Sequence, residues 1–274
     1  MPELPEVQTV VNDLQILTGD TITGFWTNFK KAIKSKSFEK EVVGKKIRSV
    51  KRLGKNIIIE LDSKNSIMLH LIMTGKLLLM DHGAWSVEQN IDKHIHHVFS
   101  LKKHDALAFS DTRKFATLEV ISPERLAEIA KSKGIDPFSK NFTLKKFAEI
   151  LANKQNKNIK SILMDQSVIS GIGNIYASEI PFDAKLNPLR KVGALTKNEI
   201  ARLHKSILKI LTKAIKMRGT SISDYRDAKG EKGGFQNELK VYGKAGKNCT
   251  KCDTIVEKVI VEQRSTFYCP TCQK

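Results

Sequence analysis

The chain has 274 residues, 41% of them hydrophobic, which is enough to bury at least one full core, and we expect two. It carries 47 Lys and Arg against 29 Asp and Glu, a formal charge of +18 at pH 7. Such a charge attracts polyanions, and nucleic acid is the expected partner. The other polyanion, an acidic membrane surface, calls for a basic amphipathic segment or a lipid anchor, and the sequence shows neither.

Two further features point to a soluble intracellular protein. The first residues, Met-Pro-Glu-Leu-Pro-Glu, carry acids where a signal peptide needs bases. The most apolar stretch, Ile67 to Met80, is interrupted by His70, Gly75 and Lys76, so it is too short and too polar to span a bilayer.

The first half of the chain changes from helical to strand periodicity. Apolar residues from Leu4 to Leu17 recur at helical spacing, which predicts a helix that begins almost at the first residue, with Pro5 in its first turn, and ends near Gly19. Between Ile47 and Ile121 five short runs read as strands. These runs, residues 56–61, 67–71, 77–80, 97–101 and 106–109, predict a β-sandwich.

The second half is mainly helical. Prolines 123 and 137 flank a helical stretch and mark the expected domain junction. Helices are expected over residues 144–151 and 159–163, and after the turn Gly171-Ile172-Gly173-Asn174, where Asn174 would cap the next helix. Thr196 and Glu199 form a capping-box pattern ahead of an amphipathic helix that stops at Gly219. The glycine-rich and charged residues 219–246 predict a mobile loop.

All four cysteines lie near the end of the sequence with the spacing C-x2-C-x16-C-x2-C, namely Cys249, Cys252, Cys269 and Cys272. Each close pair can chelate one metal ion, and the insert is long enough for a β-hairpin, so the spacing predicts one structural zinc ion, Zn2+. Two disulfides, or redox chemistry of the C-x-x-C pairs, are the alternatives. Nothing else in the sequence suggests an oxidising compartment.

Several motifs in a fixed order give the sequence a family resemblance. They are Met1-Pro2-Glu3-Leu4-Pro5-Glu6-Val7, Arg52-Leu53-Gly54-Lys55, His70-Leu71-Ile72-Met73-Thr74-Gly75, Asp111-Thr112-Arg113-Lys114-Phe115, Gly171-Ile172-Gly173-Asn174-Ile175-Tyr176, Gln236-Asn237-Glu238-Leu239-Lys240-Val241-Tyr242-Gly243 and the finger containing Arg264. Together they closely resemble the bacterial formamidopyrimidine-DNA glycosylases from end to end.

The resemblance implies a catalytic role for Pro2. Removal of Met1 would leave a secondary amine, and because α-amino groups have a pKa near ~8, a useful fraction is unprotonated at neutral pH. Such an amine can attack the anomeric carbon of a sugar. Glu3 then corresponds to the residue that supplies a proton to the opening ring, and Glu6 has a supporting role through hydrogen bonds. Without the resemblance, Pro2 reads as a helix-start residue and the two acids as favourable charges at a helix N-terminus.

The resemblance assigns two more catalytic residues, Lys55 and Arg264. Lys55 matches the lysine that meets the target phosphate and assists elimination, although a lone lysine in a turn is usually solvated surface. Arg264 matches the arginine that clamps phosphates around the extruded nucleotide, a task for which a guanidinium is well suited. The zinc ion would stiffen the hairpin that carries Arg264.

The remaining site residues also follow from the resemblance. Met73, Arg113 and Phe115 match the residues that fill the void left by an extruded nucleotide, whereas core packing is the alternative for Met73 and Phe115. The resemblance implies DNA contacts for His94, Arg113, Lys160 and Asn174, and the charge of Lys157 adds a nonspecific attraction for phosphates. His94, His96 and His97 do not suggest a metal site, because no fitting carboxylates accompany them.

As the resemblance implies, the fold is multidomain α+β, with DNA bound in the cleft between domains. We expect an N-terminal catalytic β-sandwich with flanking helices over residues 1–130, a helix-two-turn-helix domain over 131–220, a lesion-recognition loop and linker over 221–246, and a zinc-finger β-hairpin over 247–274. The expected protein is a monomer of the bacterial cytoplasm, associated with the nucleoid through DNA.

The expected activity is that of a bifunctional glycosylase and abasic-site lyase of base excision repair. It would excise 8-oxoguanine and formamidopyrimidine and then cut the strand by β,δ-elimination. Leu4 favours this family over the related endonuclease VIII enzymes, which act on oxidised pyrimidines, but the variable loop Thr220–Gly234 leaves the lesion preference open. Asp253 and Ala116 replace common glycines of the family and remove no catalytic group. A noncatalytic zinc-ribbon protein that binds nucleic acid, or the same chemistry on oxidised pyrimidines, are the alternatives.

Overall fold

The computed structural model describes residues 1–80 and 93–274. These residues form two compact units, each built from two stretches of chain. The first unit contains Met1–Lys131 and Met217–Gly234, and the second contains Ser132–Lys216 and Phe235–Lys274. Among the described helices, none is both long and apolar enough to cross a membrane.

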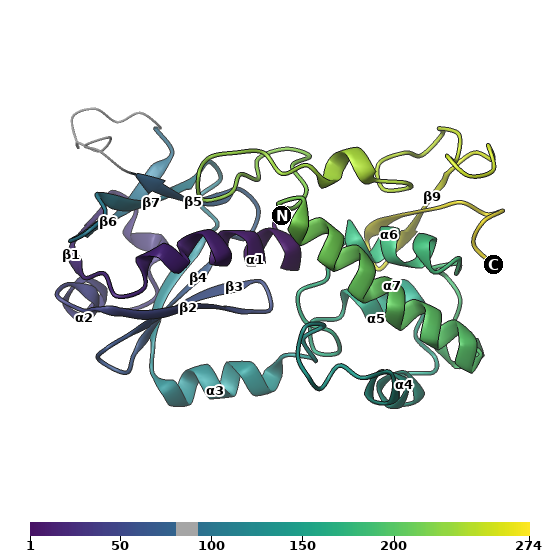
Figure 1. Cartoon of the computed structure of the whole chain (residues 1–274), viewed down its shortest axis with the longest axis horizontal. Coiled ribbons are helices and arrows are strands. Elements are labelled where there is room, and N and C mark those ends of the chain that lie inside the picture. The colour runs from purple at the N-terminus through teal and green to yellow at the C-terminus, as the bar shows by residue number, and fades with distance from the viewer. Residues whose placement is uncertain (81–92) are drawn as a thin grey trace. The chain divides into compact units, whose positions relative to one another are not determined.

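The first unit contains two four-stranded antiparallel sheets, which confirms the predicted β-sandwich (Figure 1). One sheet has the order β1 (Ile22–Thr27), β6 (Ile95–Leu101), β7 (Ala106–Asp111), β5 (Gly75–Met80). The other has the order β2 (Ile47–Leu53), β3 (Asn56–Leu61), β4 (Ser66–His70), β8 (Thr117–Ile121). The first unit also contains α1 (Leu4–Asp13), the 3₁₀ turn η1 (Leu14–Leu17), η2 (Lys30–Ala32) and α2 (Phe38–Val42). Helix α3 (Pro123–Ser132) follows β8.

One apolar core joins helix α1 to both sheets. Val10 of α1, Ile57 and Leu69 of one sheet, and Phe99 and Phe109 of the other belong to the same buried cluster. Each of these side chains has at most 1% of its surface exposed, so their burial stabilises the sandwich by roughly 1.5–3 kcal/mol per side chain.

The strand pairing brings several loops to one end of the sandwich. Thr27 at the end of β1 pairs with His97 near the start of β6, and Gly75 at the start of β5 pairs with Asp111 at the end of β7. In the other sheet, β2 turns into β3 through residues 54–55, and His70 at the end of β4 pairs with the first residue of β8. Short connections, residues 71–74 and 112–116, join the two sheets at this end. The loops around residues 28, 54, 73, 94 and 113 therefore share one rim, which we call the site rim.

His97 gives the first unit a predicted dependence on pH. Its side chain is 3% exposed and its Nδ1 lies 2.9 Å from Oγ1 of Thr27. Burial, followed by the neighbouring His96, lowers the pKa of His97 to about 4 from its ordinary value of 6.5. The unfolded chain therefore binds the proton first as the pH falls, so the stabilising contribution present above pH ~6.5 is lost toward pH ~4.

We expect the free energy of unfolding to fall by about 2 kcal/mol between pH 7.5 and 5 through this one group. His97→Gln removes the titrating imidazole, so the free energy of unfolding should change less with pH over this range. Denaturant unfolding of both proteins across this pH range measures the difference. Parallel profiles for the two proteins would show that His97 does not carry the effect.

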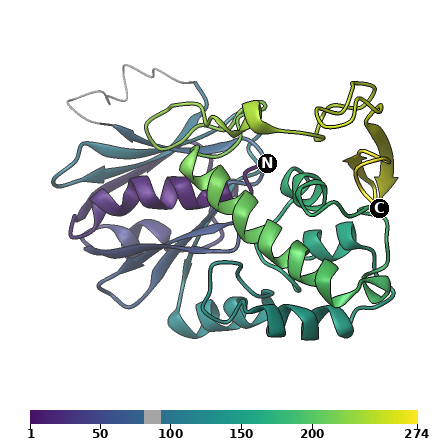
Figure 2. The ribbon, with the colours of Figure 1, turned by 45° about the vertical axis from the view of Figure 1, so that its right-hand side comes forward.

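The second unit is mainly helical, as expected. It contains α4 (Leu144–Ala152), α5 (Ile159–Met164), α6 (Tyr176–Asp183), η4 (Val192–Ala194), the long helix α7 (Lys197–Lys216), η5 (Phe235–Glu238) and the hairpin strands β9 (Glu257–Val261) and β10 (Arg264–Tyr268) (Figure 2). The capping box ahead of α7 is present, since the Thr196 N–H donates to Glu199 Oε2 at 2.8 Å and the Glu199 N–H donates to Thr196 Oγ1 at 3.3 Å. Helix α7 packs against α4 and α6.

Candidate active site and zinc centre

The start of the chain is held by hydrogen bonds to Glu6. Pro2 and Glu3 are buried and precede α1 directly, whereas Met1 is exposed. The Glu3 N–H donates to Glu6 Oε2 at 2.8 Å, and the two residues form a reciprocal capping box. The other oxygen of Glu6, Oε1, accepts from the Thr220 N–H at 2.7 Å. One carboxylate thus joins the first residues of the chain to residue 220, within the first unit.

The segment Met217–Gly234 is anchored to α1 rather than being the mobile loop that its composition predicts. Arg218 bridges Asp13 of α1 at 2.6 Å and the buried Asp227 at 2.5 Å. The Tyr225 hydroxyl donates to the carbonyl of Glu6 at 3.3 Å. Burial, followed by the Glu6 carboxylate, raises the pKa of Tyr225, so its hydroxyl remains a neutral donor. These contacts fix the segment beside Pro2 and Glu3.

Gly219 allows Glu6 to approach this segment. Its φ is +81°, and a Cβ built on it would lie 2.9 Å from both Cγ and Oε1 of Glu6. Gly219→Ala should therefore displace the carboxylate, break its bond to the Thr220 N–H and destabilise the protein by about 1–3 kcal/mol. Thermal unfolding and cleavage of damaged duplex measure the effect.

The matched control is Gly230→Ala. Gly230 has a similar φ of +83°, but, its chain neighbours aside, no atom of the described residues lies within 4 Å of the added Cβ. It therefore reports the cost of the left-handed backbone alone. Equal losses of stability and cleavage in the two variants would mean that the contact with Glu6 is unimportant.

Three residues assigned to void filling meet at the site rim. The Arg113 guanidinium donates to the Met73 sulfur at 3.2 Å and lies 4.8 Å from the centre of the Phe115 ring. The Met73 and Phe115 side chains are 38% and 51% exposed. Both apolar groups are therefore at the surface, and core packing does not describe them.

The buried carboxylate of Asp111 supports this exposed group. It accepts the Thr74 hydroxyl, the Arg113 N–H at 3.2 Å and the Ala116 N–H at 2.7 Å. Asp111 is 5% exposed. One acid thus fixes both loops that carry Met73, Arg113 and Phe115.

Lys55 and His94 also lie at the site rim. Gly54 and Lys55 form the two-residue turn between β2 and β3, where Gly54 has a φ of +61°. The Lys55 side chain is half-buried, and so is that of His94, whose carbonyl accepts from the Asp111 N–H at 2.8 Å. Within the described residues, the histidines take part in no cluster suited to a metal ion.

In the second unit, the turn before α6 differs from its prediction. Asn174 does not cap the helix, because Ile175 occupies the N-cap position and no side chain caps it. Instead, Oδ1 of Asn174 is buried and has no hydrogen-bond partner among the described residues.

Lys160 lies behind this turn rather than at the surface. It is completely buried, and its ammonium donates to the Asn174 carbonyl at 3.1 Å and to the Ser178 hydroxyl at 3.0 Å. Lys160 thus holds the Asn174 turn. Sequence reasoning missed this, because helical spacing alone does not reveal which partners a buried lysine finds.

The zinc-finger hairpin presents Arg264 next to a tight turn. Arg264 pairs with Val261 across β9 and β10, and the intervening Glu262 and Gln263 have φ values of +46° and +61°. The Arg264 side chain is exposed. Lys157 lies 3.7 Å from Glu262 and, together with Asp165 and Arg264, lines a cavity of about 230 Å³. The second unit therefore brings Lys157 and Arg264 to one cavity.

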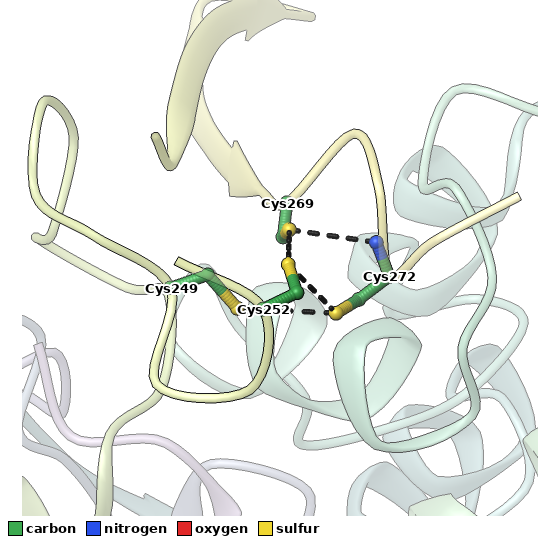
Figure 3. Close-up of side chains that lie close together, drawn as sticks. All are labelled: Cys249, Cys252, Cys269 and Cys272. Carbon is green, nitrogen blue, oxygen red and sulfur yellow. Dashed lines mark hydrogen bonds between the residues drawn. The ribbon is translucent and has the colours of Figure 1, made fainter. Parts of the chain in front are cut away.

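The four cysteines gather into one cluster, with all four sulfur atoms within 4.8 Å of one another (Figure 3). The Sγ distances are 3.9 Å for Cys249 and Cys272, 3.4 Å for Cys252 and Cys269, and 3.3 Å for Cys252 and Cys272. A tetrahedron of thiolates at about 2.3 Å from zinc has sulfur separations of about 3.8 Å, so the cluster fits one zinc ion. No disulfide joins these cysteines. The site is structural, because four protein ligands leave no position open for a substrate.

Another missed residue, Glu179, joins α6 to the chain that leads to the finger. Its carboxylate accepts the N–H groups of Lys240, Val241 and Tyr242 at 2.8–3.0 Å. Burial raises the pKa of Glu179, and the three backbone donors oppose that shift. A lone glutamate in a helix gives no sequence signal for such a contact.

A β-sandwich with Pro2 just ahead of its first helix, a helical unit and a four-cysteine finger together define a zinc-containing DNA glycosylase. Three family models agree with this class. Residues 1–118 match the formamidopyrimidine-DNA glycosylase N-terminal domain, residues 133–226 match the formamidopyrimidine-DNA glycosylase H2TH domain, and residues 246–274 match the zinc finger found in FPG and IleRS. The chain belongs to the formamidopyrimidine-DNA glycosylase family.

Similar proteins cover the chain completely. A formamidopyrimidine-DNA glycosylase of Carboxydothermus hydrogenoformans is 41% identical over 100% of both chains. A Lactococcus lactis FPG variant in complex with DNA containing Fapy-dG is 35% identical, with a TM-score of 0.89 over 100% of both chains. The wild-type Lactococcus lactis FPG in complex with DNA containing an oxidised pyrimidine is also 35% identical, with a TM-score of 0.88 over 100% of both chains.

Proposed function

We propose that this protein is a bifunctional DNA glycosylase and abasic-site lyase that removes 8-oxoguanine and formamidopyrimidine from duplex DNA. The observation that carries the proposal is the arrangement of the first unit. Pro2 and Glu3 directly precede α1, and the Glu6 carboxylate of that helix ties them to residue 220. The same unit carries a surface group formed by Met73, Arg113 and Phe115. This combination suits covalent attack on a nucleotide that has been taken out of the base stack.

The proposed chemistry begins after removal of Met1. The lone pair of the Pro2 nitrogen attacks C1′ of the damaged nucleotide, the bond to the base breaks, and the base leaves with the proton that the Pro2 nitrogen loses. Glu3 supplies a proton to the deoxyribose ring oxygen as the ring opens, which gives an iminium ion. Its positive charge makes the C2′ proton acidic, so loss of that proton expels the 3′ phosphate and a second elimination expels the 5′ phosphate. The bond between Pro2 and the sugar remnant is then hydrolysed.

The other residues bind and position the DNA in this proposal. Lys55 and Arg264 pair with phosphates flanking the extruded nucleotide and stabilise the charge that develops as each phosphate leaves. Met73 and Phe115 replace the lost stacking, and the Arg113 guanidinium donates to the base left without a partner. Glu6 positions Glu3 and residue 220 rather than touching the substrate.

The second unit supplies further phosphate contacts. Turning the Asn174 amide by 180° would place its NH2 group where Oδ1 is now buried without a partner. The NH2 group can donate to a phosphate oxygen, whereas Oδ1 can only accept. Lys157 and His94 are proposed as additional contacts, and Lys160 acts by holding the Asn174 turn. We further propose that the protein acts as a monomer in the bacterial cytoplasm, bound to the nucleoid.

Defined lesions test the proposed activity. The Met1-processed protein is incubated with duplexes that contain 8-oxoguanine opposite cytosine, a formamidopyrimidine, an oxidised pyrimidine or no damage. Rapid cleavage at the first two lesions, leaving phosphate on both sides of the gap, is the expected result. Binding without cleavage of any duplex would favour a noncatalytic protein.

An oxidised pyrimidine is the second candidate substrate, because a 35% identical neighbour was crystallised with DNA that contains one. Faster cleavage at that lesion than at 8-oxoguanine would replace the proposed substrate and leave the Pro2 chemistry in place.

A further inference from the structure

A lysine-rich segment begins at the site rim and has no part in the chemistry described above. It follows β1 directly and contains four exposed lysines, Lys30, Lys31, Lys34 and Lys36, which we call the lysine rim. Thr27, the last residue of β1, pairs with His97 at the end of β6 that adjoins His94. The strand order therefore places the start of the lysine rim, Lys30 and Lys31, at the same end of the sandwich as His94 and Arg113.

Backbone contacts hold the segment along strand β8, where Ile33 pairs in parallel with Leu118, so Lys34 and Lys36 lead away from the site rim. The Lys34 N–H donates to the Leu118 carbonyl at 2.8 Å, and the Val120 N–H donates to the Ser35 hydroxyl at 2.7 Å. Ala32, between the lysines, is buried in the core of the sandwich. The Lys34 ammonium donates to the Lys31 carbonyl at 3.2 Å. The lysines thus stand on a fixed backbone, so less conformational freedom is lost when they bind a ligand.

A cation–ring contact links the segment to the loop that carries the void-filling residues. The Lys114 ammonium lies 5.3 Å from the centre of the Phe29 ring, and Lys114 stands between Arg113 and Phe115. The Asn28 side chain in turn meets His96 Nδ1 at 2.8 Å. The lysine rim is therefore continuous with the surface that meets DNA in the proposed function.

We propose that the lysine rim binds phosphates of the DNA duplex and extends the footprint of the enzyme beyond the extruded nucleotide. The inference rests on the proposed function. A row of ammonium groups on a fixed segment matches the regular negative charge of a duplex backbone, and the contacts are independent of sequence. The lysines act on affinity for the duplex and touch no reacting atom.

Salt dependence of binding to undamaged duplex tests the inference. The variant K30Q/K31Q/K34Q removes three charges of the lysine rim. The control K46Q/K102Q/K103Q removes three exposed lysines at the opposite end of the sandwich, where β6 turns into β7 and where β2 begins. Both variants therefore have the same net charge.

Each phosphate contact adds about 0.9 to the steepness with which the logarithm of the binding constant falls against the logarithm of the salt concentration. We expect the lysine-rim variant to lose about 2–3 from the slope and at least about tenfold in affinity near 100 mM salt. The control should lose less than one unit of slope. The rate of abasic-site cleavage at saturating DNA should be the same in both variants and the wild-type protein.

Equal losses of slope in the two variants would overturn the inference, because the effect would then come from net charge alone. An unchanged slope in the lysine-rim variant would overturn it as well. Failure of the proposed function has a different signature, since wild-type protein would then bind duplex with a steep salt slope and cleave no lesion.

Discussion

Replacing Glu3 with glutamine is expected to lower the rate of 8-oxoguanine excision by at least about 10³-fold, within the usual range for loss of a general acid. The amide cannot deliver a proton to the deoxyribose ring, whereas it keeps the size and the acceptor oxygen of the carboxylate. Single-turnover cleavage of a duplex with 8-oxoguanine opposite cytosine measures the loss.

A preformed abasic site separates this role from a structural one. Because its sugar can open without help from the protein, Glu3→Gln should slow strand cleavage there much less than it slows base excision. The fold should be intact, since Glu3 is a buried member of the capping box and glutamine can accept the same bond. Equal losses on both substrates, or a large drop in thermal stability, would show that Glu3 acts through the fold of the N-terminus instead.

Loss of the zinc ion is expected to abolish specific DNA binding. Structural zinc contributes about 10–16 kcal/mol of folding free energy in isolated finger peptides, far more than the hairpin strands can replace. Cys252→Ser should therefore release the metal, unfold the hairpin that presents Arg264 and weaken binding of damaged duplex by at least about 100-fold. Zinc content by mass spectrometry and a binding titration measure the two effects.

Thr271→Ala is the matched control for the cysteine variant. Thr271 lies between Cys269 and Cys272, and its hydroxyl accepts from Thr254 at 2.9 Å without contributing a thiolate. This variant should retain one zinc ion and near-native affinity. The first unit is compact without the finger, so it should stay folded in the cysteine variant. Its aromatic side chains should therefore still contribute to the near-ultraviolet circular dichroism. Full affinity in a zinc-free protein would contradict the structural role of the metal.

The sequence predicted the strands whose side chains form apolar runs, but it missed three others. Residues 56–61 and 106–109 were predicted because both faces of β3 and β7 are largely buried. Strand β2 carries Arg48, Lys51 and Arg52 on partly exposed positions, so its periodicity is weak. Strand β1 contains Gly24, and strand β8 has only two buried residues. Both strands are defined by pairing with a neighbour that is distant in the sequence, β6 for β1 and β4 for β8.

The candidate site was predicted where local motifs carry the chemistry and missed where distant residues meet. Cysteine spacing was sufficient for the zinc cluster, and the structure brings all four sulfur atoms together. The contact between Glu6 and residue 220 spans most of the chain, so no local pattern reveals it. The same reason explains the Arg218 bridge from Asp13 to Asp227 and the buried position of Lys160.

Borohydride trapping on a duplex with 8-oxoguanine opposite cytosine tests the central claim most directly. The protein is compared with Met1 removed and with Met1 retained, and the cross-linked peptide is mapped by mass spectrometry. The account predicts a covalent adduct on the Pro2 nitrogen, accompanied by strand cleavage, in the processed protein only. An adduct on a lysine, or equal trapping of the protein that retains Met1, would contradict it.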